Sequence, residues 1–262
     1  MGGPSDELRF LADSDNRLAL LTQLPDVDTL DRYTLEDDLD ASRRTIVRTL
    51  DAFERRGYLR TADTADAYHP TGYGVYLSQL FAEFETELAT AIRLRPFLEQ
   101  IDAAELGVDP RRLQDAELTV ASEVCPYAAF DRFLKIRTEA ESVRFLAPKI
   151  ERRSLNQVVR RIEEEPAFEA EIIITEPVQS SMQAHQGFQD AFETMLAAEP
   201  VSVYRYTDSI SCMLADLDDR VAIGVSRNDQ PYALVESEDA AVREWVCDQL
   251  DAYRDDAEPI TT

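Results

Sequence analysis

Residues 33–60, YTLEDDLDASRRTIVRTLDAFERRGYLR, are the stretch that decides the fold of the N-terminal part of the chain. They contain a short helix signal, a brief break, and a longer amphipathic helix that ends at Gly57. Asp40 or Ser42 can cap the start of the longer helix, and Gly57 can end it. Its apolar residues recur at helical spacing and predict a face turned toward a core: Ile46, Val47, Leu50 and Phe53.

The opposite face of this helix carries arginines. At about 100° per residue, Arg44, Arg48 and Arg55 line up away from the apolar side chains. Two helices joined by a tight turn, with basic side chains outward on the second, form the helix-turn-helix that reads a DNA major groove. The alternative is an exposed helix whose arginines are only solvated. The residues predicted to contact DNA are Ser42, Arg43, Arg44, Thr45, Arg48 and Arg55.

The segment that follows fits a winged helix. A polar tip, residues 61–67, separates the strand signals at 58–60 and 68–70, which predicts a hairpin. A hairpin at this place can lie along a phosphate backbone. Thr71 and Gly72 then begin a long helix.

The chain of 262 residues has a net charge of −25, which is far from the usual sign for a nucleic-acid binder. Lys135 and Lys149 are its only lysines, and an acidic chain with so little lysine resembles a haloarchaeal cytoplasmic protein. In molar salt, charges are screened within about 3 Å. We therefore interpret the net charge as an adaptation to salt. Locally, residues 42–60 carry six arginines against two acidic residues.

Cysteine and histidine usage argues against metal and disulfide frameworks. Cys125, Cys212 and Cys247 are widely spaced, form no CxxC pair, and have only His69 and His185 beside them. No apolar run approaches the length of a membrane span, and no signal peptide opens the sequence. We expect a cytoplasmic protein with no metal, no cofactor and no membrane partner.

Domain organisation follows from a long helix and a polar break. Residues 73–101 show apolar spacing over several turns, which predicts a helix that links two domains and pairs with its counterpart in a homodimer. The alternative is a helix packed only on its own domain. The polar segment 102–117 predicts the boundary between domains. The predicted divisions are 1–72 (winged helix-turn-helix), 73–101 (linker and dimerisation helix) and 115–255 (effector domain).

The C-terminal half alternates strand and helix signals, which predicts an α/β layer. The chain as a whole is therefore predicted to be α+β: a winged helix-turn-helix, a long linker helix and an α/β domain. A helix from Ser180 or Ser181 through Ala198 and a final helix around Trp245 are part of this prediction. Strands are expected at 118–123, 142–148, 168–175, 201–207, 212–218, 220–226 and 232–237, and further helices at 127–138 and 150–165.

Two sets of residues resemble known families. Ser42-Arg43-Arg44-Thr45, Gly57-Tyr58-Leu59 and Tyr68-x-Pro-Thr-Gly72 resemble archaeal winged-helix regulators over about residues 8–80. Pro126-Tyr127-Ala128, Asp131-Arg132-Phe133 and Ala140-x-x-Val143-Arg144 resemble the effector domain of the methanogenesis regulator family and of TrmB-like sugar-responsive regulators. The chain is also similar to haloarchaeal TbsP-like regulators. The resemblance implies a phospholipase D-like effector domain that has lost its chemistry.

The sequence itself bears on that lost chemistry. Phospholipase D enzymes use His-x-Lys-x4-Asp, and the corresponding run here is Ser209-x-Ser211-x4-Asp216, with serine in place of both His and Lys. His185 has no lysine two residues on. We therefore expect no enzymatic activity. The alternative for both serines is that they are polar strand positions without a ligand.

An anion site is predicted at the carboxyl ends of the strands, where open α/β sheets bind their ligands. A helix that starts at Ser180 or Ser181 would present free N–H groups to an anion. Each residue taken alone is more often structural, and those two serines are first of all helix caps. A sugar phosphate or another small anionic metabolite is the expected effector. The predicted site is Lys149, Arg152, Glu176, Ser180, Ser181, Ser209 and Ser211.

Together these patterns predict a dimeric DNA-binding transcriptional regulator whose second domain senses a small metabolite. Ligand binding would change the spacing of two recognition helices, which matters because half-sites repeat at about 34–36 Å. The alternative is a winged-helix adaptor whose second domain binds a protein partner and no metabolite.

Overall fold

The computed structural model describes residues 3–31, 35, 39, 41–62, 67–149, 151–165 and 168–261. Residues 1–89 and 90–262 form two compact units, called here the N-terminal and C-terminal units. The division falls inside helix α5 (Gly72–Leu98), earlier than the polar segment 102–117 at which the sequence predicts it. The reason is packing, because Leu94, Phe97 and Leu113 are fully buried in the C-terminal core.

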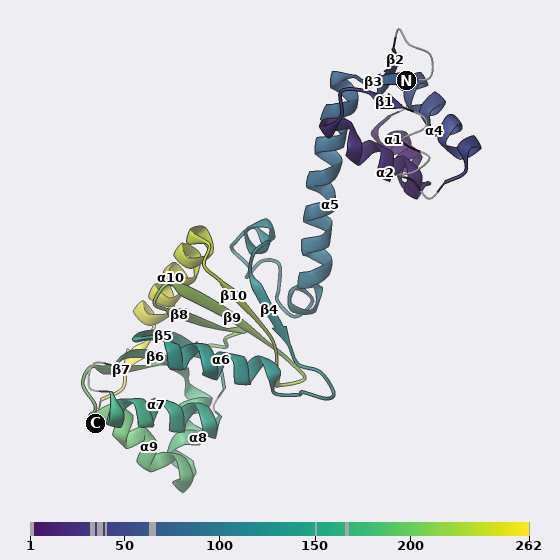
Figure 1. Cartoon of the computed structure of the whole chain (residues 1–262). Helices are drawn as coiled ribbons and strands as arrows, with labels where there is room; N and C mark the ends of the chain where they lie inside the picture. The colour runs from purple at the N-terminus through teal and green to yellow at the C-terminus, as the bar shows by residue number, and fades with distance from the viewer. Residues whose placement is uncertain are drawn as a thin grey trace. The chain divides into compact units, whose positions relative to one another are not determined.

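The N-terminal unit is a winged helix (Figure 1). Three antiparallel strands lie in the order β1-β3-β2, with Leu30 opposite Tyr68 and Arg60 opposite His69. The hairpin predicted after the recognition helix is thus confirmed, although its tip, 63–66, lies outside the described residues. So does most of the short helix predicted before Asp40; of it, Leu35 and Leu39 are described and are buried. The elements are α1 (Pro4–Ala12), α2 (Asp15–Gln23), η1 (Leu24–Asp26), β1 (Leu30–Asp31), α4 (Arg43–Arg55), β2 (Leu59–Thr61), β3 (Ala67–Pro70) and the first turns of α5.

Helix α4 begins and ends as its sequence predicts. The Ser42 hydroxyl accepts a hydrogen bond from the Thr45 backbone N–H at 3.3 Å, which satisfies one of the free donors of the first turn. Gly57 follows the last turn with a φ of +78°, a conformation that glycine adopts without steric cost. Ile46, Leu50 and Phe53 are buried, so the apolar face is confirmed.

The first residues of α5 pack against Gly57 and Tyr58, which follow α4. Thr71 donates its hydroxyl to the carbonyl oxygens of Gly57 and Tyr58, at 2.6 and 3.1 Å, and accepts from the Gly74 N–H at 3.0 Å. A Cβ atom at Gly74 would collide with the Tyr58 carbonyl group. Only glycine allows the two backbone segments to approach this closely.

Gly74→Ala should destabilise the N-terminal unit by about 1–3 kcal/mol, the usual cost of forcing an extra methyl into a packed site. Gly72→Ala is the matched control, because a Cβ there meets nothing within 4 Å. Thermal unfolding followed by circular dichroism measures the effect. The fluorescence of Trp245, the single tryptophan of the chain, reports on the C-terminal unit and should not change. Equal stability of the two glycine variants would contradict this packing.

The C-terminal unit is an eight-stranded mixed sheet in the order β11-β7-β6-β5-β8-β9-β10-β4. Strands β5, β6 and β7 are parallel, and every other neighbouring pair is antiparallel. The α+β class predicted from the sequence is confirmed. The strands are β4 (Glu117–Val120), β5 (Ser142–Ala147), β6 (Glu169–Thr175), β7 (Val201–Tyr206), β8 (Cys212–Leu217), β9 (Arg220–Arg227), β10 (Gln230–Ser237) and β11 (Glu258–Pro259).

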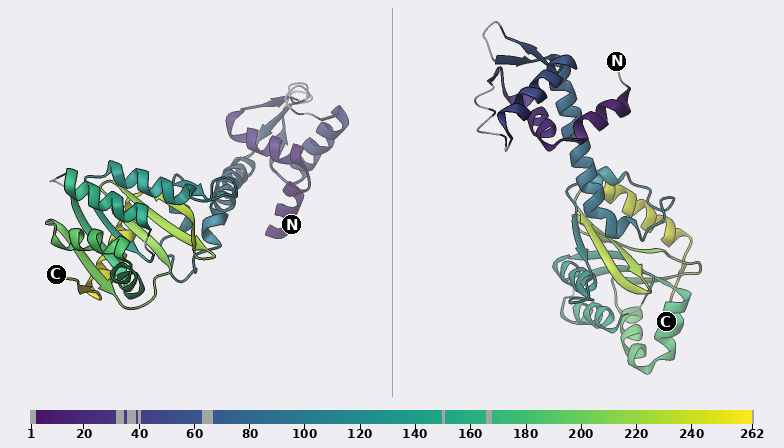
Figure 2. Two further views of the ribbon diagram at one scale, coloured as in Figure 1. Left: turned by 90° about the horizontal axis from the view of Figure 1, so that it is seen from below. Right: turned by 90° about the vertical axis from the view of Figure 1, so that its right-hand side faces the viewer.

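Helices cover both faces of this sheet (Figures 1 and 2). One core lies beneath α6, α7, α8 and α9, and the other beneath α10, η2 and the last turns of α5. The helices are η2 (Pro110–Leu113), α6 (Ala128–Glu139), α7 (Arg152–Glu164), α8 (Glu176–Ala184), α9 (Gln186–Ala197) and α10 (Ala240–Asp255). Among the described helices, none has both the length and the apolar character needed to cross a bilayer.

One helix prediction was wrong. The structure has two helices, α8 and α9, where the sequence predicts a single helix from Ser180 or Ser181 to Ala198. Helix α8 begins at Glu176 with Thr175 as its N-cap residue, so the two serines lie inside the helix and cap nothing. Pro177 occupies the first helical turn, where its missing N–H has no intrahelical partner to lose.

Candidate functional site

The outward face of α4 carries the arginines that the sequence predicts to contact DNA. Arg44, Arg48 and Arg55 are exposed, on the side opposite the buried Ile46 and Leu50. Within the described residues, none of these three guanidinium groups takes part in an ion pair. In a chain with a net charge of −25, arginines gathered on one exposed helix face can attract an anionic partner.

The other predicted DNA-contacting residues lie at the start of α4. Arg43 is exposed on the first helical turn. Ser42 and Thr45 bond each other through their hydroxyls at 2.9 Å, so part of their hydrogen-bonding capacity fixes the helix start. The structure therefore places all six predicted residues on one helix and its cap.

Arg56 has a structural role, although it adds to the local positive charge in the sequence. Its guanidinium is bonded to Glu7 and lies 3.8 Å from the centroid of the Phe10 ring. Tyr58 also donates to Glu7, and burial together with this carboxylate raises the pKa of its hydroxyl. These contacts tie α1 to the end of α4, so Arg56 does not join Arg44, Arg48 and Arg55 on the exposed face.

The predicted anion site is only partly assembled. Lys149 follows β5, and Ser209 and Ser211 precede β8. The three residues lie at the same end of these two neighbouring strands, because β8 runs antiparallel to β5. Lys149 there already donates to the backbone oxygen and the carboxylate of Asp229, at 2.7 and 2.9 Å.

The remaining predicted residues lie on helices. Glu176 is the first residue of α8, which also contains Ser180 and Ser181, and the Ser181 carbonyl accepts from His185. Arg152, at the start of α7, lies 5.3 Å from the centroid of the Phe188 ring.

Two adjoining cavities, together called here the α7 cavity, lie against β5 and the start of α7. Their volumes are about 90 and 40 Å³. They share part of their walls: Phe145, Ala147, Lys149, Glu151 and Ser154. Of the seven residues predicted to bind an anion, Lys149 is the one that lines them. The larger cavity is also lined by Phe130, Phe133, Met213, Val225 and Pro231, and the smaller one by Val178, Met182 and Met195.

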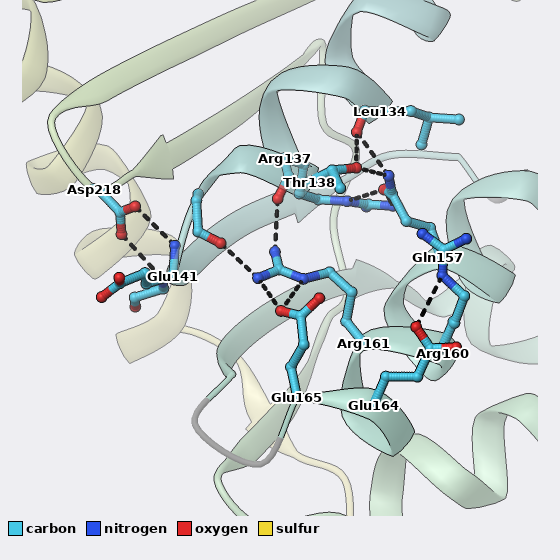
Figure 3. A network of polar contacts seen from close by, with 12 residues as sticks. Leu134, Arg137, Thr138, Glu141, Gln157, Arg160, Arg161, Glu164, Glu165 and Asp218 are labelled. Carbon is cyan, nitrogen blue, oxygen red and sulfur yellow. Dashed lines mark hydrogen bonds and ion pairs between the residues drawn. The ribbon is translucent and has the colours of Figure 1, made fainter.

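A buried arginine lies directly behind this wall. Arg137 is fully buried and bonds to Gln157 Oε1 at 2.8 and 2.5 Å (Figure 3). It also bonds to the hydroxyl and backbone oxygens of Ser154 at 2.9 and 2.8 Å. Burial lowers the pKa of this guanidinium to about 9, so the group stays charged at neutral pH. Nearby, Arg161 is also buried and pairs with Glu165 at 2.6 Å (Figure 3). No local pattern singles out Arg137, because burial depends on tertiary packing.

Two arginines of the resemblance motifs serve the fold. Arg132 forms a bidentate pair with the buried Glu236 at 2.6 and 2.8 Å, and its hydrogen bond to that carboxylate raises the pKa of the guanidinium. Arg144 joins Glu171 and Asp251 at 2.9 and 2.6 Å. These pairs connect α6 to β10, and β5 to β6 and α10.

The residues that correspond to the phospholipase D motif are dispersed or engaged. Ser209 and Ser211 are exposed in the loop between β7 and β8. Asp216 on β8 accepts from Arg243 at 3.2 Å and from the Cys247 thiol at 3.4 Å. Within the described part of the chain, no group of three or more His, Cys, Asp or Glu side chains could hold a metal ion.

A winged helix with a basic outward face, followed by an α/β domain with an apolar cavity, defines the class of a two-domain DNA-binding regulator. Residues 126–256 match the family of the methanogenesis regulatory protein FilR1, middle domain, and residues 5–93 match the HVO_A0261 N-terminal domain. The first match spans 131 of the 262 residues, and the chain belongs to this FilR1 middle-domain family. The relation to the methanogenesis regulators that the effector-domain motif implies is thereby confirmed. No protein with curated annotation matches the chain.

Similar solved structures are distant in sequence. TrmBL2, described as an archaeal chromatin protein with a novel mode of DNA binding, shares 11% identity over 98% of this chain and 100% of its own, with a TM-score of 0.42. The phospholipase D family member Nuc from Salmonella typhimurium shares 13% identity over 56% of this chain and 99% of its own, with a TM-score of 0.42. NucT from Helicobacter pylori shares 11% identity over 55% and 98%, with a TM-score of 0.44.

Proposed function

We propose that this protein is a DNA-binding transcription regulator of the cytoplasm, in which the winged helix binds double-stranded DNA and the C-terminal unit senses a small molecule. The observation that supports this function most directly is the α4 face, where Arg44, Arg48 and Arg55 are exposed and make no ion pair with a described residue. The acidic composition and scarce lysine support a haloarchaeal source and a place near the TbsP-like regulators.

Enrichment of genomic DNA fragments by the purified full chain in molar KCl tests this function. A defined set of fragments should be retained and should be released as salt rises, because phosphate contacts displace condensed counterions and make affinity fall with salt. Chromatin immunoprecipitation should recover the same loci. If no fragment is enriched above random DNA at any KCl concentration, the proposed function is wrong.

The protein acts as a homodimer through α5. Large apolar side chains stay exposed three or four residues apart along one face of this helix: Tyr73, Tyr76, Leu80, Phe84 and Leu88. A second copy supplies an equivalent apolar face, which is what a two-fold interface needs. Molar salt screens the repulsion between two acidic chains, so these conditions favour the pairing.

Leu80→Glu with Phe84→Glu should convert a dimer into a monomer, because four charges would be buried in a two-fold interface. Light scattering in molar KCl measures the mass. The control carries the same added charge away from the stripe, at the exposed positions Gln79→Glu and Ala82→Glu, and should remain dimeric. A monomeric wild-type protein would overturn this interface.

The C-terminal unit does not cleave phosphodiesters. The serines at the positions of the catalytic His and Lys supply neither a nucleophile with a neighbouring base nor a fixed phosphate-binding cation. Plasmid DNA and small phosphodiester substrates should remain intact after prolonged incubation with the protein. Cleavage that disappears with Asp216→Asn would contradict this.

A further inference from the structure

The walls of the α7 cavity determine the shape and polarity of what could fill it. Aromatic and aliphatic side chains dominate both parts, and Lys149 and Glu151 are the charged residues of the lining. Cavities of about 150 Å³ lined by such residues accept a benzene-sized molecule. The two adjoining volumes here are of that order. A compact apolar body fits, whereas a sugar would leave most of its hydroxyls without partners.

The buried positive charge of Arg137, behind the cavity wall, favours an anionic ligand. Arg137 donates to the neutral oxygens of Gln157 and Ser154, and no described carboxylate bonds to it. Its buried neighbour Arg161 pairs with Glu165, whereas Arg137 has no such carboxylate among the described residues. A buried charge without a counter-ion is costly, and a negative group placed next to it offsets that cost.

Ser154 connects this charge to the cavity. It lines both parts of the cavity, and its hydroxyl oxygen accepts from Arg137 Nη1 at 2.9 Å. Its own proton is therefore available to donate, and no acceptor among the described residues takes it. Phe133 and Phe145, whose ring centroids lie 5.1 and 5.2 Å from the Arg137 guanidinium carbon, form the adjoining wall.

The two charged side chains of the lining favour a ligand with a single negative charge. Lys149 is already paired with Asp229 and has two of its donors occupied. Glu151 is the acidic member of the lining, so a dianionic phosphate would meet a like charge there. A monoanion meets less of this repulsion than a dianion does.

We propose that the α7 cavity is the effector site of the C-terminal unit and binds a small carboxylate with a branched or aromatic body. Its carboxylate accepts from the Ser154 hydroxyl, and its body packs against Phe130, Phe133 and Met213. This inference rests on the sensing role in the proposed function and assigns that role a place and a ligand class.

Calorimetric titration of the full chain in molar KCl tests the site with four probes: benzoate, phenylacetate, isobutyrate and isovalerate. Benzamide serves as the neutral counterpart of benzoate, and glucose 6-phosphate as the sugar phosphate. The chloride of the medium saturates unspecific anion sites. At least one of the four carboxylates should bind, and benzoate should bind with higher affinity than benzamide. The carboxylate that binds should raise the melting temperature of the unit that contains Trp245.

Three variants locate the binding. Ala147 lines both cavities, so the larger side chain of Ala147→Leu should fill the space for the ligand and abolish carboxylate binding. Ser154→Ala should weaken it about tenfold to a hundredfold, the value of a hydrogen bond to a charged group. Ser202→Ala, which replaces an exposed serine on β7 outside the cavity, should leave the binding unchanged. In addition, Arg137→Met should remove the preference for benzoate over benzamide while apolar binding persists.

Each remaining outcome has a definite meaning. If none of the four carboxylates binds, or if Ala147→Leu binds as well as the wild type, the site is wrong. Binding of glucose 6-phosphate alone would retain the sensing role and overturn the ligand class. Carboxylate binding in a protein that enriches no DNA would retain the site and overturn the proposed regulator.

Discussion

Replacement of both Arg44 and Arg48 by alanine should weaken DNA binding by about 2–6 kcal/mol, since good base contacts are worth about 1–3 kcal/mol each. Both side chains are exposed on the outer face of α4, away from the buried Ile46 and Leu50. If either arginine binds a phosphate and not a base, the dependence of log K on log salt should also become shallower, by about 0.9 for each phosphate that the variant no longer neutralises. Fluorescence anisotropy with an enriched fragment across a KCl series measures both quantities.

A matched control separates the site from the net charge. Arg9→Ala with Arg160→Ala removes the same two charges from exposed positions on α1 and α7. This control should bind DNA within a few tenths of a kcal/mol of the wild type, and both double variants should melt at the wild-type temperature. Equal losses in the two double variants would show that only overall charge matters, and the recognition face of α4 would be wrong.

Arg132→Ala should destabilise the C-terminal unit by about 3–5 kcal/mol, because it removes the main partner of a buried carboxylate. Glu236 is 3% exposed, and the partner that would remain is Arg220 at 3.4 Å. For a unit of this size, each kcal/mol lowers the melting temperature by about 2–4 °C. Thermal unfolding followed by Trp245 fluorescence should therefore show a lower transition, with the N-terminal unit unaffected.

Arg153→Ala provides the comparison for this loss. Arg153 pairs with Asp131 at 2.7 Å, and both side chains are more than half exposed. Surface pairs contribute about 0–1 kcal/mol, so the expected shift is small. Glu236→Gln should be milder than Arg132→Ala, because the amide oxygen still accepts from Arg132 and no buried anion remains. If Arg132→Ala and Arg153→Ala melt alike, the pair with Glu236 contributes little to stability.

The sequence by itself determined the elements whose causes are local. The α4 helix follows from the 3.6-residue spacing of Ile46, Leu50 and Phe53, the Ser42 cap and the left-handed Gly57. Because the same spacing fixes the opposite face, it also placed Arg44 and Arg48 outward. The strands and hairpins of the C-terminal half were predictable for the same reason, since alternation and turn residues act over a few neighbours.

Only the tertiary structure decided the order of the strands, the boundary of the units and the lining of the cavity. The end of α5 belongs to the C-terminal core because distant segments bury Leu94 and Phe97, which no local pattern encodes. The two-residue strands β1 and β11 exist only through their pairing with β3 and β7. Ser180 and Ser181 carry a cap signal, but Thr175 begins the helix where β6 ends. Arg137 looks like any surface arginine in the sequence, and it becomes a buried charge beside a cavity because α6 and α7 pack over the same sheet.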